Sequence, residues 1–259
     1  MLEKPKYYLK TLGDALEILD VLSQSQNPMG VAELNKEMGT GRSKIHRILD
    51  TLKYWGCVEQ NPLTRKYFLG PKVLELAMKK LESIDLIQVA SPLLVELVDL
   101  CEETIHLAVL DKGQVLYLDK KEGPQAVGII SKVGQRLPAH CTGLGKVLLA
   151  YSDEDLLNTV IKTVGLHRFT DHTITDEHTL REELEKVCKL GYSEDNEEIE
   201  KGLCCIAAPI KNYRGAVVAA ISVSLPEFRF TNEKKIYLKA KVIEYAERIS
   251  RKLGYVMSK

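Results

Sequence analysis

Residues 137–146 form the segment whose composition best fits the binding of a small anion. Within it, Thr142 stands directly before Gly143-Leu144-Gly145 and can cap a helix that begins there. The first amide groups of a helix have no partner inside the helix, and glycine lets a ligand approach the backbone, so such a turn favours a carboxylate. The run is not a phosphate loop, because it lacks both the longer gap between the glycines and a Ser or Thr after the lysine. We expect Lys146 to be a solvated helix residue.

Polar residues within two apolar, strand-like runs form a second candidate group. Side chains alternate along a strand, so Leu203 and Cys205 share one face of their run and Ser222 and Ser224 share one face of the next. A buried hydroxyl needs a hydrogen-bond partner, which can be a backbone carbonyl or a polar ligand. Asp195 precedes the first run. An ionised carboxylate beside an acid is unfavourable, so Asp195 must bond a ligand hydroxyl, hold a backbone amide or be protonated.

The same segments suggest two other kinds of chemistry. His140, Cys141, Asp195 and Cys205 are zinc-type ligands, although their spacing matches no recognised zinc signature. Cys141 or Ser222 together with His140 could serve a thiol or serine hydrolase. The sequence has no Gly-x-Ser-x-Gly motif, and adjacent residues such as His140 and Cys141 point apart on a strand. We therefore expect no catalytic residue, cofactor or metal, with metal or redox sensing as the alternative.

Residues 42–54 predict a helix that reads DNA. One face is apolar, and the other carries most of the polar residues, including Arg42, Ser43, His46 and Arg47. A recognition helix needs this division, because one face packs on the preceding helix while the other presents donors to the major groove. The break at Gly39-Thr40-Gly41 separates it from a short helix near residues 31–38, which completes a helix-turn-helix.

The segment after this helix predicts a basic wing. Residues 57–60 and 66–69 are typical of two short strands around a turn that contains Pro62, and Arg65 and Lys66 are placed to meet phosphates. Between residues 41 and 67, six basic residues, Lys44 among them, outnumber two acidic ones. This local surplus supplies the phosphate contacts that give affinity for duplex DNA. Trp55, at the helix end, is expected in the core.

The composition of the whole chain limits the class of protein. Lysine plus arginine and aspartate plus glutamate both number 36 among 259 residues, so a basic surface over the whole chain is excluded. No apolar run approaches the roughly 20 residues that cross a bilayer, and the N-terminus does not resemble a signal peptide. The six cysteines are scattered and contain no Cys-x-x-Cys pair. We expect a cytoplasmic protein with reduced thiols and no membrane partner.

Two domains of the α+β class are expected to position these residues. Residues 1–70 would form the winged domain, 71–88 a linker helix and 89–259 a larger domain. A helical stripe of Leu12, Leu16, Leu19 and Leu22 marks the first helix. In the larger domain, strands are expected at 104–110, 115–120, 126–132, 203–210 and 216–224. Helices are expected at 92–101, 144–151, 153–164, 176–190 and 231–253, an irregular alternation that fits α+β.

The sequence resembles the IclR family of bacterial transcription regulators over nearly its whole length. The first matching run is VAELNKEMGTGRSKIHRILDTLKYWGCVEQNPLTRKYFLGPKVLEL. GQRLPAHCTGLGKVLLA, GYSEDNEEIEKGLCCIAAPI and GAVVAAISVS follow in the order and spacing of the family. These three later segments are more specific together than the helix-turn-helix, which unrelated families share.

The resemblance implies a winged DNA-binding domain, a linker helix and a GAF-like effector domain that assemble as a homodimer or homotetramer. It implies a repressor or activator whose affinity for double-stranded operator DNA responds to a small organic acid, such as a keto, sugar-derived or aromatic acid. It places effector contacts at Gly143, Leu144, Asp195, Leu203, Cys205, Ser222 and Ser224, and an apolar wall at Ala126, Ile129 and Leu137. Together with Thr142, these residues are the expected effector site.

Overall fold

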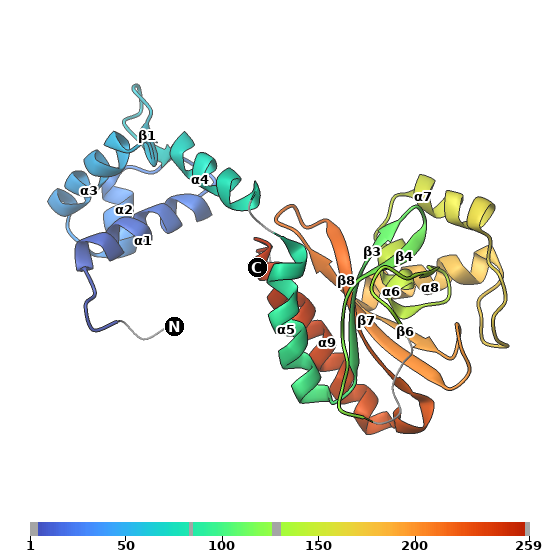
Figure 1. The fold of residues 1–259 in the computed structure, drawn as a ribbon. Helices are drawn as coiled ribbons and strands as arrows, with labels where there is room; N and C mark the ends of the chain where they lie inside the picture. The colour runs from blue at the N-terminus through green and yellow to red at the C-terminus, as the bar shows by residue number, and fades with distance from the viewer. Residues whose placement is uncertain (1–4, 83–84, 126–130, 257–259) are drawn as a thin grey trace. The chain divides into compact units, whose positions relative to one another are not determined.

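The computed structural model describes residues 5–82, 85–125 and 131–256 and divides the chain into two units, residues 1–83 and 84–259. The first unit contains three helices, α1 (Lys10–Gln24), α2 (Val31–Met38) and α3 (Arg42–Tyr54), followed by a hairpin of β1 (Val58–Gln60) and β2 (Tyr67–Leu69) and by α4 (Pro71–Glu82) (Figure 1). Its core is formed by buried residues of the three helices and the hairpin, namely Ile18, Leu22, Leu34, Ile45, Ile48, Leu49, Val58 and Tyr67. This is the winged helix-turn-helix expected from the sequence.

The turn between α2 and α3 depends on glycine. Gly39 and Gly41 both adopt positive φ angles, 63° and 96°, which residues with a Cβ rarely adopt. Asn35 holds the turn at both positions, because its carbonyl accepts the Gly39 amide at 2.9 Å and its side-chain oxygen accepts the Gly41 amide at 2.8 Å. These bonds fix the angle at which α3 leaves α2.

Two expectations for this part of the chain are wrong, and the helical stripe of α1 is only partly buried. Leu22 is buried and Leu19 packs against the core, whereas Leu12 and Leu16 are both 57% exposed, because the buried face of α1 passes through Asp14, Ile18 and Leu22. Trp55 is exposed rather than in the core. Residues 71–88 do not form one helix: α4 ends at Glu82, and α5 (Leu86–Cys101) begins after Asp85, whose carboxylate accepts the amides of Ile87 and Gln88 as an N-cap.

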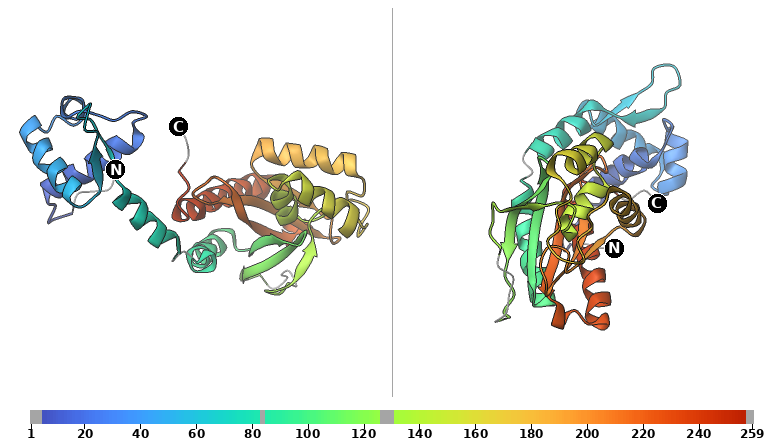
Figure 2. Two further views of the ribbon diagram at one scale, coloured as in Figure 1. Left: turned by 90° about the horizontal axis from the view of Figure 1, so that it is seen from above. Right: turned by 90° about the vertical axis from the view of Figure 1, so that its right-hand side faces the viewer.

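The second unit is built on a six-stranded antiparallel sheet in the order β5-β4-β3-β8-β7-β6. Its strands are β3 (Thr104–Asp111), β4 (Gln114–Lys121), β5 (Arg136–Pro138), β6 (Ser193–Asn196), β7 (Leu203–Lys211) and β8 (Val217–Pro226). Helices α5 and α9 (Asn232–Lys252) cover one face (Figure 1). The other face carries α6 (Gly143–Ala150), α7 (Glu154–Thr159) with a π-helical turn (Val160–Val164), and α8 (Glu177–Leu190), as Figure 2 also shows.

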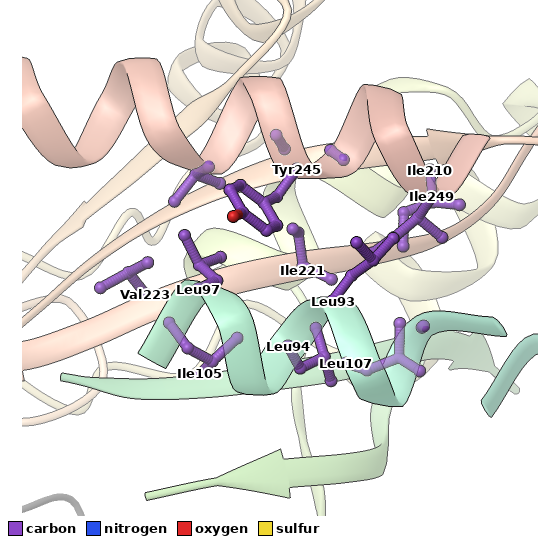
Figure 3. Close-up of a cluster of buried hydrophobic side chains, with 14 of the residues drawn as sticks. Leu93, Leu94, Leu97, Ile105, Leu107, Ile210, Ile221, Val223, Tyr245 and Ile249 are labelled. Atoms are coloured by element: carbon purple, nitrogen blue, oxygen red, sulfur yellow. The ribbon is translucent and has the colours of Figure 1, made fainter. Parts of the chain in front are cut away.

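Alternation along the strands separates two cores. Ile105 and Leu107 of β3, with Ile221 and Val223 of β8, meet α5 and α9 in an apolar layer that also contains Tyr245 (Figure 3). The intervening residues point to the opposite face, where Ala108 and Ala220 pack with α6 and α8. The chemically interesting side chains of β3, β7 and β8 also lie on this second face.

The larger domain corrects the sequence analysis at three further places. Pro92 lies inside α5 rather than at its start. Of the strand expected at 126–132, residues 126–130 lie outside the described residues, and Ser131 and Lys132 are not in a strand. Asp195, which precedes the first run along the chain, belongs to a strand that was not expected, the edge strand β6, where it pairs with Cys205. Among the described residues, no helix is long and apolar enough to span a bilayer.

Candidate functional site

A cavity opens between α6, the sheet and the turn after β6. Nine residues that the sequence analysis assigned to an effector site line it together: Leu137, Thr142, Gly143, Leu144, Asp195, Leu203, Cys205, Ser222 and Ser224. Ala126 and Ile129, the other two, lie outside the described residues. Tyr117, Ser131, Gln135, Ile199 and Glu200 also line the cavity and were not anticipated. The site therefore combines a helix N-terminus, strand hydroxyls and one buried carboxyl group.

Thr142 caps α6 as expected. Its hydroxyl accepts the Gly145 amide at 3.2 Å and donates to the carbonyl of Pro138 at 3.1 Å. Gly145 is required because a Cβ there would stand 2.2 Å from the backbone oxygen of Ala139. The cap leaves the amides of Gly143 and Leu144 at the cavity end of α6, where the helix dipole favours negative charge.

Asp195 is the buried acidic group of the cavity. Its side chain is 0% exposed, and one carboxyl oxygen accepts the backbone amide of Glu198 at 2.8 Å. The other oxygen has no hydrogen-bond partner within the described residues. Burial and then the charge of Glu198 raise the pKa of Asp195 from 3.8 to about 7, although Lys146 opposes the shift. Two of the three possibilities from the sequence therefore apply together: Asp195 holds a backbone amide, and it is largely protonated below neutral pH.

Lys146 is not solvated, contrary to expectation. It is only 1% exposed, and its ammonium group forms ion pairs with Glu198 and, at 3.3 Å, with Glu183. These carboxylates raise the pKa of Lys146 despite its burial. The ion pair with Glu198 joins α6 to the turn after Asp195, so it fixes one wall of the cavity.

The strand hydroxyls belong to a connected set of polar groups. The Cys205 thiol donates to the Ser224 hydroxyl at 3.2 Å, and Ser224 contacts Nδ1 of His106 at 3.3 Å. Ser222, 1% exposed, lies on the same face and pairs with His106 across the β3–β8 register. His106 was not among the residues expected at the site. The alternation of Thr104, His106 and Ala108 with apolar residues could have placed it on this face.

The alternatives of metal binding and hydrolysis find no support in the geometry. Among the described residues, no group of His, Cys, Asp or Glu side chains could hold a metal ion. His140 activates no neighbour: its Nε2 donates to the carbonyl of His167 at 3.0 Å, and its Nδ1 has no hydrogen-bond partner within the described residues. Burial, followed by the charge of Asp195, raises the pKa of the Cys141 thiol to about 12 and that of Cys205 well above its ordinary value. Neither thiol is therefore an activated nucleophile.

The residues expected to contact DNA fall into two groups, those that are exposed and those that form ion pairs within the first unit. Arg42, Ser43, His46 and Arg47 are exposed on the N-terminal half of α3, and Arg65 is exposed at the turn of the hairpin. Two other candidates form intramolecular ion pairs, Lys44 with Asp14 of α1 and Lys66 with Glu33 of α2. The structure thus leaves an exposed basic edge along α3 and the hairpin turn.

Family models match both units of the chain. Residues 11–62 match the IclR helix-turn-helix domain, and residues 78–251 match the C-terminal domain of the bacterial transcriptional regulator IclR. The chain belongs to the IclR family of bacterial transcriptional regulators. This IclR protein is therefore a regulator rather than the hydrolase considered above.

Individual IclR relatives match almost from end to end. The HTH-type transcriptional regulator KdgR of Escherichia coli (strain K12) is 37% identical over 238 residues, which cover 92% of this chain and 90% of KdgR. The HTH-type transcriptional regulator XynR of the same strain is 34% identical over 247 residues, which cover 95% of this chain and 98% of XynR. The crystal structure of the Agobacterium tumefaciens repressor BlcR matches with a TM-score of 0.86 and 28% identity, covering 96% of this chain and 99% of BlcR.

Proposed function

We propose that this IclR regulator binds operator DNA through α3 and the hairpin and changes its DNA affinity when a small organic acid occupies the cavity of the second unit. The observation that carries the proposal is the convergence of the α6 N-terminus, the partly satisfied Asp195 carboxyl and the serine hydroxyls on one cavity. As a DNA-binding regulator, the protein is expected to act in the bacterial cytoplasm.

The groups around the cavity suit an acid with a second polar function. A ligand carboxylate can accept hydrogen bonds from the amides of Gly143 and Leu144. When Asp195 is protonated, its hydroxyl can donate to the acid instead of repelling it. The cavity between the described residues has a volume of about 80 Å³. At about 10–15 Å³ for each water-sized group, this volume accommodates a compact aliphatic acid.

The proposed DNA contacts follow from the exposed edge of the first unit. Residues near the start of a recognition helix contact base edges, which assigns Arg42, Ser43, His46 and Arg47 to the major groove. Arg65 in the hairpin turn is assigned to a phosphate. Lys44 and Lys66 are weaker candidates, because any contact with DNA competes with their ion pairs.

We propose a two-state coupling between the cavity and the DNA. In a homodimer or homotetramer, paired recognition helices read half-sites about 34–36 Å apart, so a change in their separation changes affinity. Acid binding shifts this equilibrium only if the acid binds the two states with different affinities.

The test measures the two activities separately in the full chain. A thermal-shift screen against glycolate, pyruvate, lactate and glycerate identifies the acid that stabilises the protein. Fluorescence anisotropy then measures the affinity for a duplex selected from a random library. Ser222→Ala with Ser224→Ala is expected to abolish stabilisation by the acid and to leave DNA affinity unchanged. An unchanged acid response in this double variant contradicts the cavity assignment.

A second pair of variants tests the DNA interface. Arg47→Ala is expected to weaken duplex binding, and it should reduce the salt dependence by about one unit of slope if the guanidinium also contacts a phosphate. Arg214→Ala removes an exposed arginine from the second unit and is the matched control. Tight binding by Arg47→Ala at moderate salt would show that the face is misassigned.

A further inference from the structure

The first turn of α6 lies directly over the part of the sheet that carries Asp195. A Cβ at Gly143 would lie 3.5 Å from the Cβ of Cys205, which is the cross-strand partner of Asp195. The Ser193 hydroxyl donates to the carbonyl of Gly143 at 2.6 Å. Ser193 and Asp195 are two residues apart on β6, so their side chains share one face of the sheet. The amides at the start of α6 and the Asp195 carboxyl group therefore border the same small cavity.

The cavity has no positive side chain that could neutralise a bound acid. The described residues that line it include no lysine, arginine or histidine, whereas Asp195 and Glu200 are acidic. Lys146 is not one of the lining residues, and its ammonium group already pairs with Glu198 and Glu183. An acid in the cavity is therefore held only by neutral hydrogen-bond donors and by the dipole of α6.

A negative charge on Asp195 conflicts with a bound acid anion. A cavity of about 80 Å³ holds only a few non-hydrogen atoms, so the charge of a bound acid lies within roughly 6 Å of Asp195. With an effective dielectric constant of about 20, two like charges at that distance weaken binding about hundredfold. Protonation removes this repulsion. It also makes the Asp195 oxygen that has no partner within the described residues a donor to the acid, while the other oxygen keeps the Glu198 amide.

The groups around Asp195 leave it as the residue that can gain a proton near neutral pH. Burial and then the charge of Glu198 raise the pKa of Asp195 to about 7, and Lys146 opposes the shift. Burial raises the pKa of Glu198 as well, but the direct ion pair with Lys146 opposes that shift and favours the ionised form. Burial also raises the pKa of the nearby phenol and thiol groups, which are uncharged near neutral pH: Tyr117, Cys141, Cys204 and Cys205.

We propose that the cavity binds a carboxylate anion together with one proton, which Asp195 takes up from the solvent, so that the regulator binds its acid more tightly as the pH falls. The inference rests on the proposed acid-binding function. The proton leaves a buffer acid and joins the free oxygen of Asp195, and no other covalent bond forms or breaks. The acid and Asp195 then carry one negative charge between them, which the start of α6 stabilises.

Isothermal titration calorimetry on the full chain counts the protons. Glycolate, pyruvate, lactate and glycerate are each titrated at pH 8 in HEPES and in Tris, and at pH 6 in MES and in Bis-Tris. The difference in apparent enthalpy between two buffers, divided by the difference in their ionisation enthalpies, gives the number of protons taken up. An acid that binds is expected to bring close to one proton at pH 8 and close to none at pH 6. Its dissociation constant should be about tenfold higher at pH 8.

Two variants assign the proton to a residue. Asp195→Asn keeps an acceptor for the Glu198 amide and offers an amide donor in place of the carboxyl proton. It should bind the acid without proton uptake at either pH and, at pH 8, about tenfold more tightly than the unmodified chain does. Glu200→Gln removes an exposed carboxylate from the same cavity and should keep the uptake of one proton.

The outcomes separate this inference from the acid-sensing proposal. Acid binding by the unmodified chain without proton uptake at pH 8 overturns the inference and leaves the acid-sensing proposal intact. The same holds if Asp195→Asn still takes up a proton, or if it binds the acid more weakly than the unmodified chain at both pH values, as a merely structural role would predict. If none of the four acids binds at either pH, the acid-sensing proposal fails and the inference fails with it.

Discussion

Asp195 is expected to make the protein less stable as the pH rises towards neutrality. The pKa of its buried carboxyl is raised from 3.8 to about 7, chiefly by burial and then by Glu198. Between these pH values the unfolded chain loses the proton while the folded protein keeps it. Stability that is fully present below about pH 4 is therefore lost progressively until about pH 7. A shift of about three pKa units corresponds to a loss of about 4 kcal/mol.

The Asp195→Asn variant isolates this effect. The amide oxygen of asparagine can still accept the Glu198 amide, but the side chain no longer titrates. The free energies of unfolding of the variant and of the unmodified chain are measured with urea between pH 4 and pH 8. As the pH rises, the value for the variant should gain up to about 4 kcal/mol relative to the value for the unmodified chain. Glu194→Gln is the control on the opposite face of β6, where loss of a partly exposed ion pair with Lys235 should cost less than about 1 kcal/mol. A difference for Asp195→Asn that stays constant with pH would show that the pKa of Asp195 is not raised in the folded protein.

Two more variants test the scaffold of the cavity by urea and thermal unfolding. Lys146→Met should lower the free energy of unfolding by about 3–5 kcal/mol, because it leaves the buried carboxylate of Glu198 without its counter-ion. Lys186→Met removes an exposed partner of Glu183 and should change the free energy of unfolding by less than about 0.5 kcal/mol. Equal effects of the two substitutions would contradict the role of the buried pair. Gly145→Ala should lower the free energy of unfolding by about 3 kcal/mol or more, because its Cβ would meet backbone atoms of Ala139. A Cβ at Gly143 has no neighbour closer than 3.5 Å, so the control Gly143→Ala should fold. A fully stable Gly145→Ala would show that the close approach is not required.

Local patterns were sufficient to predict much of the cavity. Thr142 was recognised as a helix cap because the capping residue and the capped amide lie three residues apart. Ser222 and Ser224 were placed on one face because alternation along a strand is a local property. The two faces of α3 followed in the same way from helical periodicity. Each of these features depends on neighbours in the sequence.

Features that depend on distant residues were missed. Lys146 was expected in solvent because its partners Glu183 and Glu198 lie 37 and 52 residues away along the chain. His106 could have been assigned to the cavity face by alternation, but its contact with Ser224 spans 118 residues and follows only from the strand order of the sheet. The break before α5 was missed although its signal, the N-cap Asp85, is local.

The most direct test of acid-controlled DNA binding is the dissociation constant for a selected duplex, measured by fluorescence anisotropy with and without a saturating concentration of the acid that stabilises the protein most. We expect the dissociation constant of the unmodified chain to change by at least about tenfold, which is within the usual range of allosteric coupling. We expect no change for the variant that lacks both the Ser222 and Ser224 hydroxyls. The same dissociation constant for the unmodified chain in both conditions would contradict the proposal that the cavity controls DNA binding.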